Sequence, residues 1–272
     1  MTQRILTAAV LIPILILAIF VFPLPVFLSI LSVLLVLGLR ELRSLLTSMN
    51  AQLFPITYLL IGGLPWVMGY RMEMLVAYLL LTLILLLFLA IIRAEDLATG
   101  LPSVSGNVFA VAYLGLPLSL LALFHPLSST GRAEPGRGWE MLLVMMIVWG
   151  ADAAAYFAGR TFGRHKVTPH LSPKKSAEGF AAGLLLPTLL VAFLGGYLVQ
   201  NRSTTFLLVA AVVVVVSGAA GDLFESMLKR GAGIKDTSDL LPGHGGVLDR
   251  IDSLLFAFPC YYLLTILWEA RF

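Results

Sequence analysis

The sequence is poor in charged residues and has almost no cysteine. Of its 272 residues, 12% are charged and 59% are hydrophobic, whereas a soluble domain carries about 25% charged residues. This deficit argues against a soluble core of this length and predicts a polytopic membrane protein. The single cysteine, Cys260, excludes an intrachain disulfide. No basic stretch is interleaved with aromatic residues for base stacking, so we expect no nucleic-acid partner despite the net charge of +3.

Long apolar segments are abundant instead. A membrane-spanning helix needs about 20 mostly apolar residues, and by that measure we place nine spans, at residues 5–21, 26–39, 54–70, 75–92, 104–124, 141–157, 180–199, 205–221 and 251–268. The valine run at 212–216 favours a strand by propensity, but a lone strand in hydrocarbon would leave its backbone unsatisfied, so a helix is expected there. The predicted fold class is an all-α polytopic integral membrane protein with about nine transmembrane helices. We expect a single membrane domain over 1–272, with N-terminal spans in 1–140 and catalytic spans and loops in 141–272.

The basic residues are distributed unevenly between the two sides of this predicted membrane domain. With nine spans, 13 lysines and arginines fall on the side of the N-terminus and 5 on the other side. The positive-inside rule makes the first side cytoplasmic. We therefore expect a cytoplasmic N-terminus, and the most charged loops face the compartment that contains nucleotides.

The most charged stretch, residues 226–252, lies between the eighth and ninth apolar segments and reads SMLKRGAGIKDTSDLLPGHGGVLDRID. Placing charged residues between two segments apolar enough to span a membrane costs free energy, so such residues usually have a function. Its glycines let the backbone approach a ligand closely, and successive glycine amides, as at Gly245 and Gly246, can form a nest for a phosphate. Cations, carboxylates and glycines together suit a phosphate-and-metal site.

Two pairs of acids are candidates for metal ligands. Asp222 and Glu225 lie three residues apart and share a face of the eighth helix, and Asp249 and Asp252 have the same spacing at the start of the ninth. Mg²⁺ prefers one or two carboxylates, with waters and substrate phosphates completing its shell. The alternatives are a solvated charge cluster for the first pair and stabilisation of a helix N-terminus for the second.

A second polar stretch, residues 152–179, contains Asp152 and the run Ser172-Pro173-Lys174-Lys175-Ser176. For Lys174 we favour phosphate binding, because the helix that follows can present its N-terminus to an anion. Cations at a membrane interface also anchor a protein to anionic lipids, which is the alternative. Three of the four histidines, His125, His165 and His170, are expected at the surface.

These residues resemble the signature of the bacterial phosphatidate cytidylyltransferases, also called CDP-diglyceride synthases. The matching elements are Ser226-x-x-Lys229-Arg230, Lys235-Asp236 and Leu241-Pro242-x-His244-Gly245-Gly246-x-x-Asp249-Arg250-x-Asp252. Upstream elements also match: Asp152 with Tyr156, Phe162-Gly163-Arg164, and Ser172-Pro173-x-Lys175-Ser176-x-Glu178-Gly179. The resemblance covers residues 149 to the end, and the first half matches only in hydropathy and span count.

The resemblance implies transfer of CMP from CTP to phosphatidate, giving CDP-diacylglycerol and pyrophosphate in phospholipid biosynthesis. It implies Mg²⁺ as cofactor, with a second cation as an open alternative. It also implies a homodimer in the inner (plasma) membrane, with the active site on the cytoplasmic face. The attacking phosphate oxygen is already anionic, so the reaction needs no strong general base. It needs metals and cations against the repulsion between two anionic substrates.

The resemblance also distributes roles among the candidate residues. The expected catalytic residues are Asp222, Asp249, Lys229 and Lys235. The expected substrate-binding residues are Lys174, Lys175, Ser176, Arg230, His244, Gly245, Gly246 and Arg250. The expected metal ligands are Asp222, Asp249, Asp152, Glu225 and Asp252, with Asp222 and Asp249 the best of them.

Three other functions compete with this one. A transporter also places charges in spans, but it often shows paired broken segments in both halves of the chain, and here the charges cluster in the C-terminal half. Another membrane phosphotransfer enzyme, such as a lipid kinase, would release a nucleoside diphosphate rather than pyrophosphate. An inactive structural homologue is the third alternative, and the complete signature argues against it.

Overall fold

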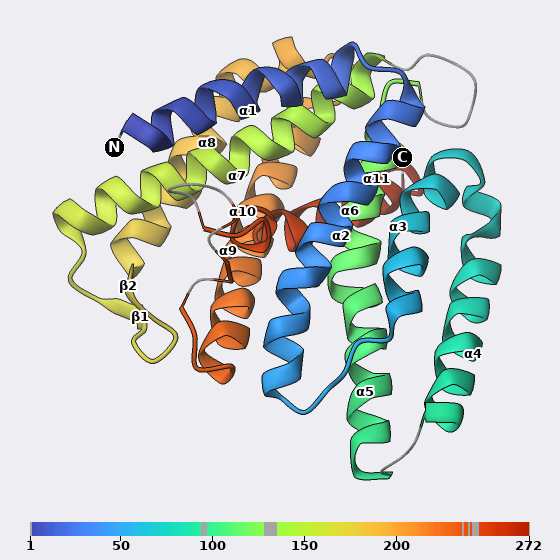
Figure 1. Cartoon of the computed structure of the whole chain (residues 1–272). Coiled ribbons are helices and arrows are strands. Elements are labelled where there is room, and N and C mark those ends of the chain that lie inside the picture. Colours follow the sequence, from blue (N-terminus) through green and yellow to red (C-terminus); the bar gives the residue numbers. More distant parts are fainter. Residues whose placement is uncertain are drawn as a thin grey trace. The chain divides into compact units, whose positions relative to one another are not determined.

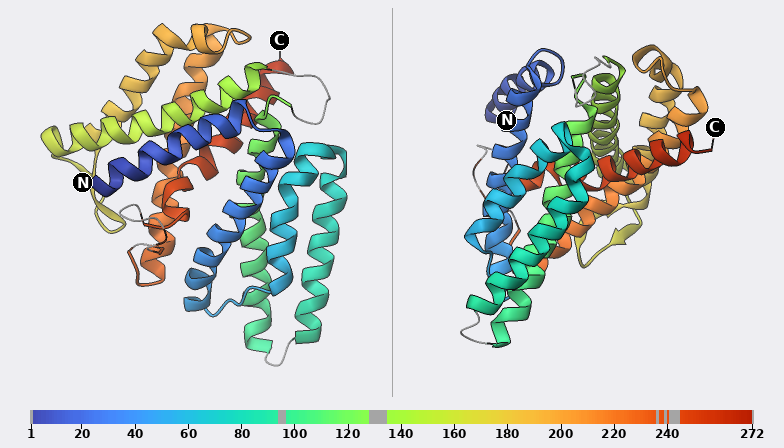
Figure 2. Two further views of the ribbon diagram at one scale, coloured as in Figure 1. Left: turned by 45° about the horizontal axis from the view of Figure 1, so that its top comes forward. Right: turned by 90° about the vertical axis from the view of Figure 1, so that its right-hand side faces the viewer.

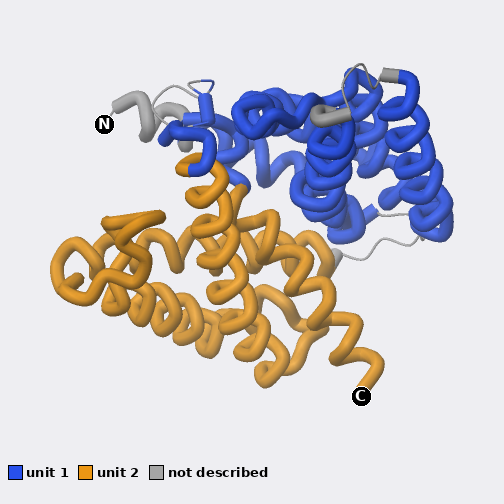
Figure 3. Tube along the Cα trace, turned by 90° about the horizontal axis from the view of Figure 1, so that it is seen from below, with its two compact units in different colours: residues 1–134, 231–251 blue, residues 135–230, 252–272 orange. Residues whose placement is uncertain are grey.

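The computed structural model describes residues 2–93, 97–127, 135–235, 237, 238, 240 and 245–271. It divides into two compact units, which are described separately (Figure 3). Unit 1 comprises residues 1–134 and 231–251, and unit 2 comprises residues 135–230 and 252–272. Each unit is therefore built from two stretches that are distant in the sequence.

Unit 1 is helical in the part of the chain that the structure describes (Figure 1). Its elements are α1 (Thr2–Phe20), α2 (Leu24–Ser48), α3 (Pro55–Tyr70), the 3-10 turn η1 (Met72–Met74), α4 (Leu75–Arg93), α5 (Leu97–Ala110), the π-helical turn η2 (Val111–Gly115), α6 (Leu116–Ser119), the 3-10 turn η3 (Leu120–Phe124) and α10 (Leu248–Ile251). Helices α2 and α3 pack along each other, as do α4 and α5 (Figure 2). Proline in the first turn of α2 and of α3 marks where these helices begin, because its missing N–H is not needed there.

Unit 2 contains four helices and a short hairpin. Its elements are α7 (Pro135–Phe162), β1 (Lys166–Thr168), β2 (Ser172–Ser176), α8 (Ala177–Leu198), α9 (Thr204–Gly231) and α11 (Leu254–Glu269). Helices α7 and α8 form its most extensive helix pair. The strands β1 and β2 are antiparallel, pairing Lys166 with Ser176 and Thr168 with Ser172.

All nine apolar segments predicted from the sequence are mainly helical, which confirms an all-α polytopic membrane protein. Among the described residues, seven helices are long and apolar enough to cross a membrane. The apolar part of α1, Ala9–Phe20, is shorter, and α3 has 16 residues. The count of nine crossings and the cytoplasmic N-terminus stay predictions.

Two of the predicted helices are interrupted. In the fifth segment the π-helical turn η2 precedes Pro117, whose missing N–H removes one helical hydrogen bond. In the ninth, α10 ends at Ile251 and α11 begins at Leu254. The carboxylate of Asp252 accepts a hydrogen bond from the N–H of Ser253 at 2.6 Å, a local bond that competes with the helical pattern.

His125 is buried, with 1% of its surface exposed, so its predicted surface position is wrong. Its ring packs against Phe27, with the ring centroids 4.9 Å apart. The N–H of Leu127 donates to Nδ1 at 3.2 Å, which leaves Nε2 to donate to the carbonyl of Phe22 at 3.2 Å. Burial lowers the pKa of His125, although the Phe22 bond opposes that shift. His165 and His170 are exposed, as predicted.

A buried charge network joins α7, α11 and the turn before α9. Arg202 donates through Nε to Glu140 at 2.9 Å and through Nη1 to Glu269 at 2.7 Å. The hydroxyl of Tyr261 donates to the second oxygen of Glu140 at 3.0 Å. Burial disfavours the charge of Arg202, but its bonds to Glu140 and Glu269 hold its pKa above the ordinary value. No motif in the sequence predicts this network.

Candidate functional site

Unit 2 gathers lysines and carboxylates where α9 ends. Lys175 on β2 forms an ion pair with Asp222 on α9, with Nζ 2.6 Å from Oδ2, and both side chains are about one-third exposed. Lys229 forms a second pair with Glu225 one turn earlier, with Nζ 2.7 Å from Oε2, and the Glu225 side chain is fully buried. We call these four residues together with Asp252 the lysine–carboxylate cluster.

Asp252 joins this cluster because its backbone lies very close to α9. A Cβ atom on Gly221 would lie 2.5 Å from the carbonyl oxygen of Asp252, so only glycine permits this approach. The side chain of Asp252 lies beside Glu225 and within electrostatic range of Asp222 and Lys229. The i, i+3 spacing of Asp222 and Glu225 thus puts both acids beside the start of the last helix.

A cavity of about 540 Å³ opens beside the cluster, between α7, β2, α8 and α9. The polar side chains of its lining include those of Asp152, Lys174, Lys175, Ser176 and Asp222. The rest of the lining is mainly apolar and includes Val148, Phe180 and Val214. Folding therefore brings the polar stretch 152–179 to the acidic end of α9.

Ser176 has a structural role in this wall. Its hydroxyl accepts a hydrogen bond from the N–H of Gly179 at 3.2 Å and so caps the N-terminus of α8. One residue into that helix, Glu178 accepts bonds from the backbone N–H groups of Arg164 and His165 and contacts the His165 ring at 2.6 Å. Ser176 and Glu178 together attach the β1–β2 hairpin, which carries Lys174 and Lys175, to α8.

Gly179 allows α7 and α8 to touch at this wall. A Cβ atom at this position would lie 2.7 Å from the carbonyl oxygen of Ala155, a backbone atom that can yield only if the helices separate. We expect Gly179→Ala to destabilise the protein by about 1–3 kcal/mol and to shift the hairpin, measured as the melting temperature and activity in detergent. Gly196→Ala on the same helix is the matched control, because a Cβ there has no neighbour within 4 Å. Equal behaviour of the two variants would contradict this account of the packing.

Asp249, in unit 1, organises the glycine-rich loop. Its Oδ2 atom accepts hydrogen bonds from the N–H of Gly246 at 2.9 Å and from the N–H and hydroxyl of Thr237 at 3.1 and 2.9 Å. Gly245 adopts a positive φ of 79°, a conformation that favours glycine. The N–H of Gly246 is thus engaged by Asp249. Among the described residues of this loop, Asp249 closes the turn between Thr237 and α10.

Glu41 on α2 is a partner of this loop that no sequence motif predicts. Its carboxylate is buried and accepts four hydrogen bonds from the loop. Oε1 accepts from the hydroxyl of Ser238 at 2.6 Å and the N–H of Val247 at 2.9 Å. Oε2 accepts from the N–H of Leu248 at 2.7 Å and lies 3.1 Å from the hydroxyl oxygen of Thr237, whose one proton it shares with Asp249. An acid directly after Arg40 at the end of an apolar run was the only local signal, and it does not indicate a partner some 200 residues away.

The remaining predicted site residues are placed as follows. Arg230, Lys235 and Arg250 are exposed. His244 and Asp236 lie outside the described residues. Asp249 belongs to unit 1 and Asp222 to unit 2, so their meeting at one metal ion stays a prediction, as do the roles given to the other residues.

Within the described part of the chain, the lysine–carboxylate cluster offers Mg²⁺ two neighbouring carboxylates, those of Glu225 and Asp252, and not a group of three or more. Among the described residues, no three His, Cys, Asp or Glu side chains are placed together to hold a metal ion. Glu225 and Asp252, however, lie next to each other, and two neighbouring carboxylates repel each other unless a cation lies between them. Mg²⁺ uses one or two carboxylates and completes its shell with water and phosphate. The cluster can therefore supply the protein's share of such a site.

The fold and the lysine–carboxylate cluster define a polytopic membrane protein with a polar site suited to phosphates. The family model described as "Cytidylyltransferase family" matches residues 2–268. The chain belongs to the cytidylyltransferase family, which confirms the resemblance seen in the signature.

The chain is similar to phosphatidate cytidylyltransferases from several bacteria. The chain is 45% identical over 133 residues to a phosphatidate cytidylyltransferase of Haemophilus influenzae, which covers 47% of this chain and 46% of the relative. It is 44% identical over 146 residues to that of Pseudomonas aeruginosa, covering 48% of each chain, and 39% identical over 124 residues to that of Bacillus subtilis, covering 46% of each. The chain thus matches about half the length of these curated relatives.

Proposed function

We propose that this protein is a Mg²⁺-dependent CTP:phosphatidate cytidylyltransferase of the bacterial inner membrane. Membership of the cytidylyltransferase family and similarity to phosphatidate cytidylyltransferases of other bacteria support this proposal. The observation that carries it is the cavity beside the Lys175–Asp222 pair, which combines cations, carboxylates and an apolar wall. One substrate lies in lipid and the other in water, and such a cavity suits both. The active site is proposed to face the cytoplasm, and the protein is proposed to act as a homodimer.

The reaction joins two anions. A phosphate oxygen of phosphatidate attacks the α-phosphorus of CTP, the bond from that phosphorus to the bridging oxygen breaks, and pyrophosphate leaves. Mg²⁺, when bound, would neutralise charge on the phosphates and on the leaving group. Asp222 and Asp249 are proposed as its main ligands, with Asp152, Glu225 and Asp252 as further candidates.

The cations have the complementary task. Lys174 and Lys175 line the cavity and can bind phosphate oxygens there, and Lys175 is already held in place by Asp222. Lys229 is oriented by Glu225, so its charge is fixed beside the cluster before a substrate arrives. Lys235, Arg230 and Arg250 are exposed and are proposed to contact CTP or the lipid phosphate.

The test is an assay of the purified full-length protein with radiolabelled CTP, phosphatidate and Mg²⁺ in mixed micelles. We expect one labelled lipid and one pyrophosphate for each CTP consumed, and loss of both products with a chelator. Lys175→Ala should lower the rate by about 10- to 100-fold. Release of a nucleoside diphosphate instead of pyrophosphate would identify a lipid kinase and overturn the proposal, as would the absence of any labelled lipid.

A further inference from the structure

A second cavity lies in unit 1, between α2 and α3, and has a volume of about 660 Å³. Val36, Arg40 and Arg43 of α2 line it, with Tyr58 and Leu59 of α3. Ligand pockets in proteins span roughly 300–1,000 Å³, so this one is large enough for a small ligand or a headgroup. The proposed reaction uses none of these five residues.

The two arginines are not neutralised within the protein. They lie three residues apart and so share a face of α2. Among the described residues, neither guanidinium forms an ion pair or a hydrogen bond. The acid between them in the sequence, Glu41, is buried and bound to the loop in front of α10. Two like charges one turn apart repel each other, and an anion placed between them would relieve that repulsion.

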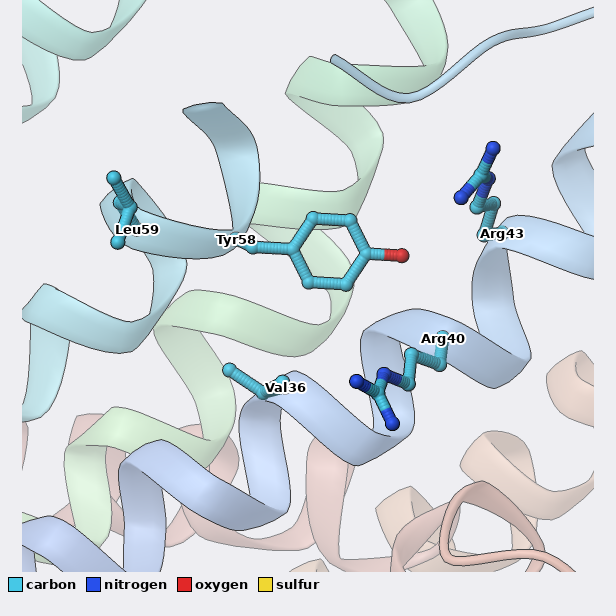
Figure 4. A pocket seen from close by; sticks show the side chains of 5 residues that line it. All are labelled: Val36, Arg40, Arg43, Tyr58 and Leu59. Atoms are coloured by element: carbon cyan, nitrogen blue, oxygen red, sulfur yellow. The ribbon is translucent and has the colours of Figure 1, made fainter. Parts of the chain in front are cut away.

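The third polar group comes from the neighbouring helix. Figure 4 shows the hydroxyl of Tyr58 directed toward the space between the side chains of Arg40 and Arg43. Both guanidiniums supply only donors and the phenol can donate a third hydrogen bond, and arginine binds phosphate with paired N–H groups. A phosphate group offers more oxygens to these three side chains than a carboxylate does, so the donor set favours phosphate.

The apolar lining indicates where the rest of the ligand lies. Val36 lies one helical turn before Arg40 and belongs to the apolar run of α2, and Leu59 is 73% exposed. That run, residues 24–39, has the composition of a membrane segment, so the arginines lie where it meets the polar boundary. A ligand with a phosphate at the arginines and hydrocarbon beside Val36 and Leu59 is a membrane lipid.

We propose that this pocket binds the phosphate headgroup of an anionic membrane lipid, with a preference for a terminal phosphate monoester. A monoester carries more negative charge and offers more free oxygens to three donor side chains than a phosphodiester does. The pocket is a lipid site in its own right. Its existence does not depend on the proposed reaction, because binding can be measured without turnover.

The experiment uses native mass spectrometry to measure how much lipid the full-length protein retains. The protein is released from phosphatidylcholine nanodiscs in which about 5–10% of the lipid molecules are a test lipid. This low fraction limits the bulk charge of the membrane. We expect retention in the order phosphatidate, phosphatidylglycerol, phosphatidylcholine. Arg40→Ala/Arg43→Ala should weaken phosphatidate binding about 10-fold or more, and Tyr58→Phe by a few-fold. The matched control is Arg71→Ala/Arg271→Ala, which removes the same charge from two exposed arginines outside the pocket.

Two further measurements test whether the ligand is a lipid or free phosphate, and whether it binds at the arginines or at the cluster in unit 2. Inorganic phosphate at the same concentration should not displace the lipid, since it lacks the apolar contacts; displacement would overturn the lipid as ligand. Asp222→Asn should keep the Arg40- and Arg43-dependent binding, because it alters the cluster in unit 2 only. Unchanged retention in the Arg40→Ala/Arg43→Ala protein, or an equal loss in the control, would overturn the site.

Discussion

Asp249→Asn is expected to lower the rate of cytidylyl transfer by at least about 100-fold while leaving the loop folded. An asparagine oxygen can occupy the position of Oδ2 and accept the same bonds from Thr237 and Gly246. What the substitution removes is the negative charge, which a metal ligand needs and a loop contact does not. The measurement is the rate of CDP-diacylglycerol formation at saturating CTP, together with the folded yield.

The paired variant is Asp249→Ala, which removes the charge and the acceptor together. It should lose activity to the same extent and should also loosen the loop, seen as faster cleavage by a protease near Thr237. If Asp249→Asn kept near-normal activity while Asp249→Ala lost it, Asp249 would act only through the loop and would not be a metal ligand.

Glu41→Gln is expected to reduce activity by about 10- to 100-fold, although Glu41 lies on a helix that the signature does not include. Each oxygen of Glu41 accepts two hydrogen bonds, and glutamine replaces one of these oxygens with an NH₂ donor. The NH₂ then faces a buried backbone N–H of the loop, that of Val247 or Leu248, which loses its acceptor at a cost of about 1–3 kcal/mol, whereas the hydroxyl beside it can turn and accept. Because Glu41 acts by holding Thr237 and the start of α10, it is a positioning residue for Asp249.

Hydrogen exchange distinguishes this role from general destabilisation. The amides of Val247 and Leu248, which donate to Glu41, should exchange faster in Glu41→Gln, while those of α7 and α8 stay protected. The control is Glu73→Gln, which alters an exposed acid of the same unit that forms an ion pair with Arg71 at 3.6 Å. Uniformly faster exchange throughout the protein would mean that Glu41 only supports the fold.

The sequence alone determined the class of protein, the helical segments and the residues of the signature. These depend on local properties: an apolar run of about 20 residues must be helical in a membrane, and an i, i+3 spacing puts Asp222 and Glu225 on one face. The signature between Ser226 and Asp252 identified the family before any contact was known, and the family match over residues 2–268 confirmed it. The preference for helix over strand in the valine run of α9 followed from the same reasoning and is confirmed.

The tertiary structure decided which groups meet. The Lys175–Asp222 pair, the four bonds from Glu41 to the loop, the burial of His125 and the arginine pocket between α2 and α3 all join residues from different elements. No local pattern encodes such contacts, because the residues around one position do not indicate which residue some 200 positions away it will contact. Glu41 shows this most clearly. In the sequence it lies next to Arg40 and close to Arg43, whereas in the folded protein its carboxylate is hydrogen-bonded to the loop that Asp249 organises.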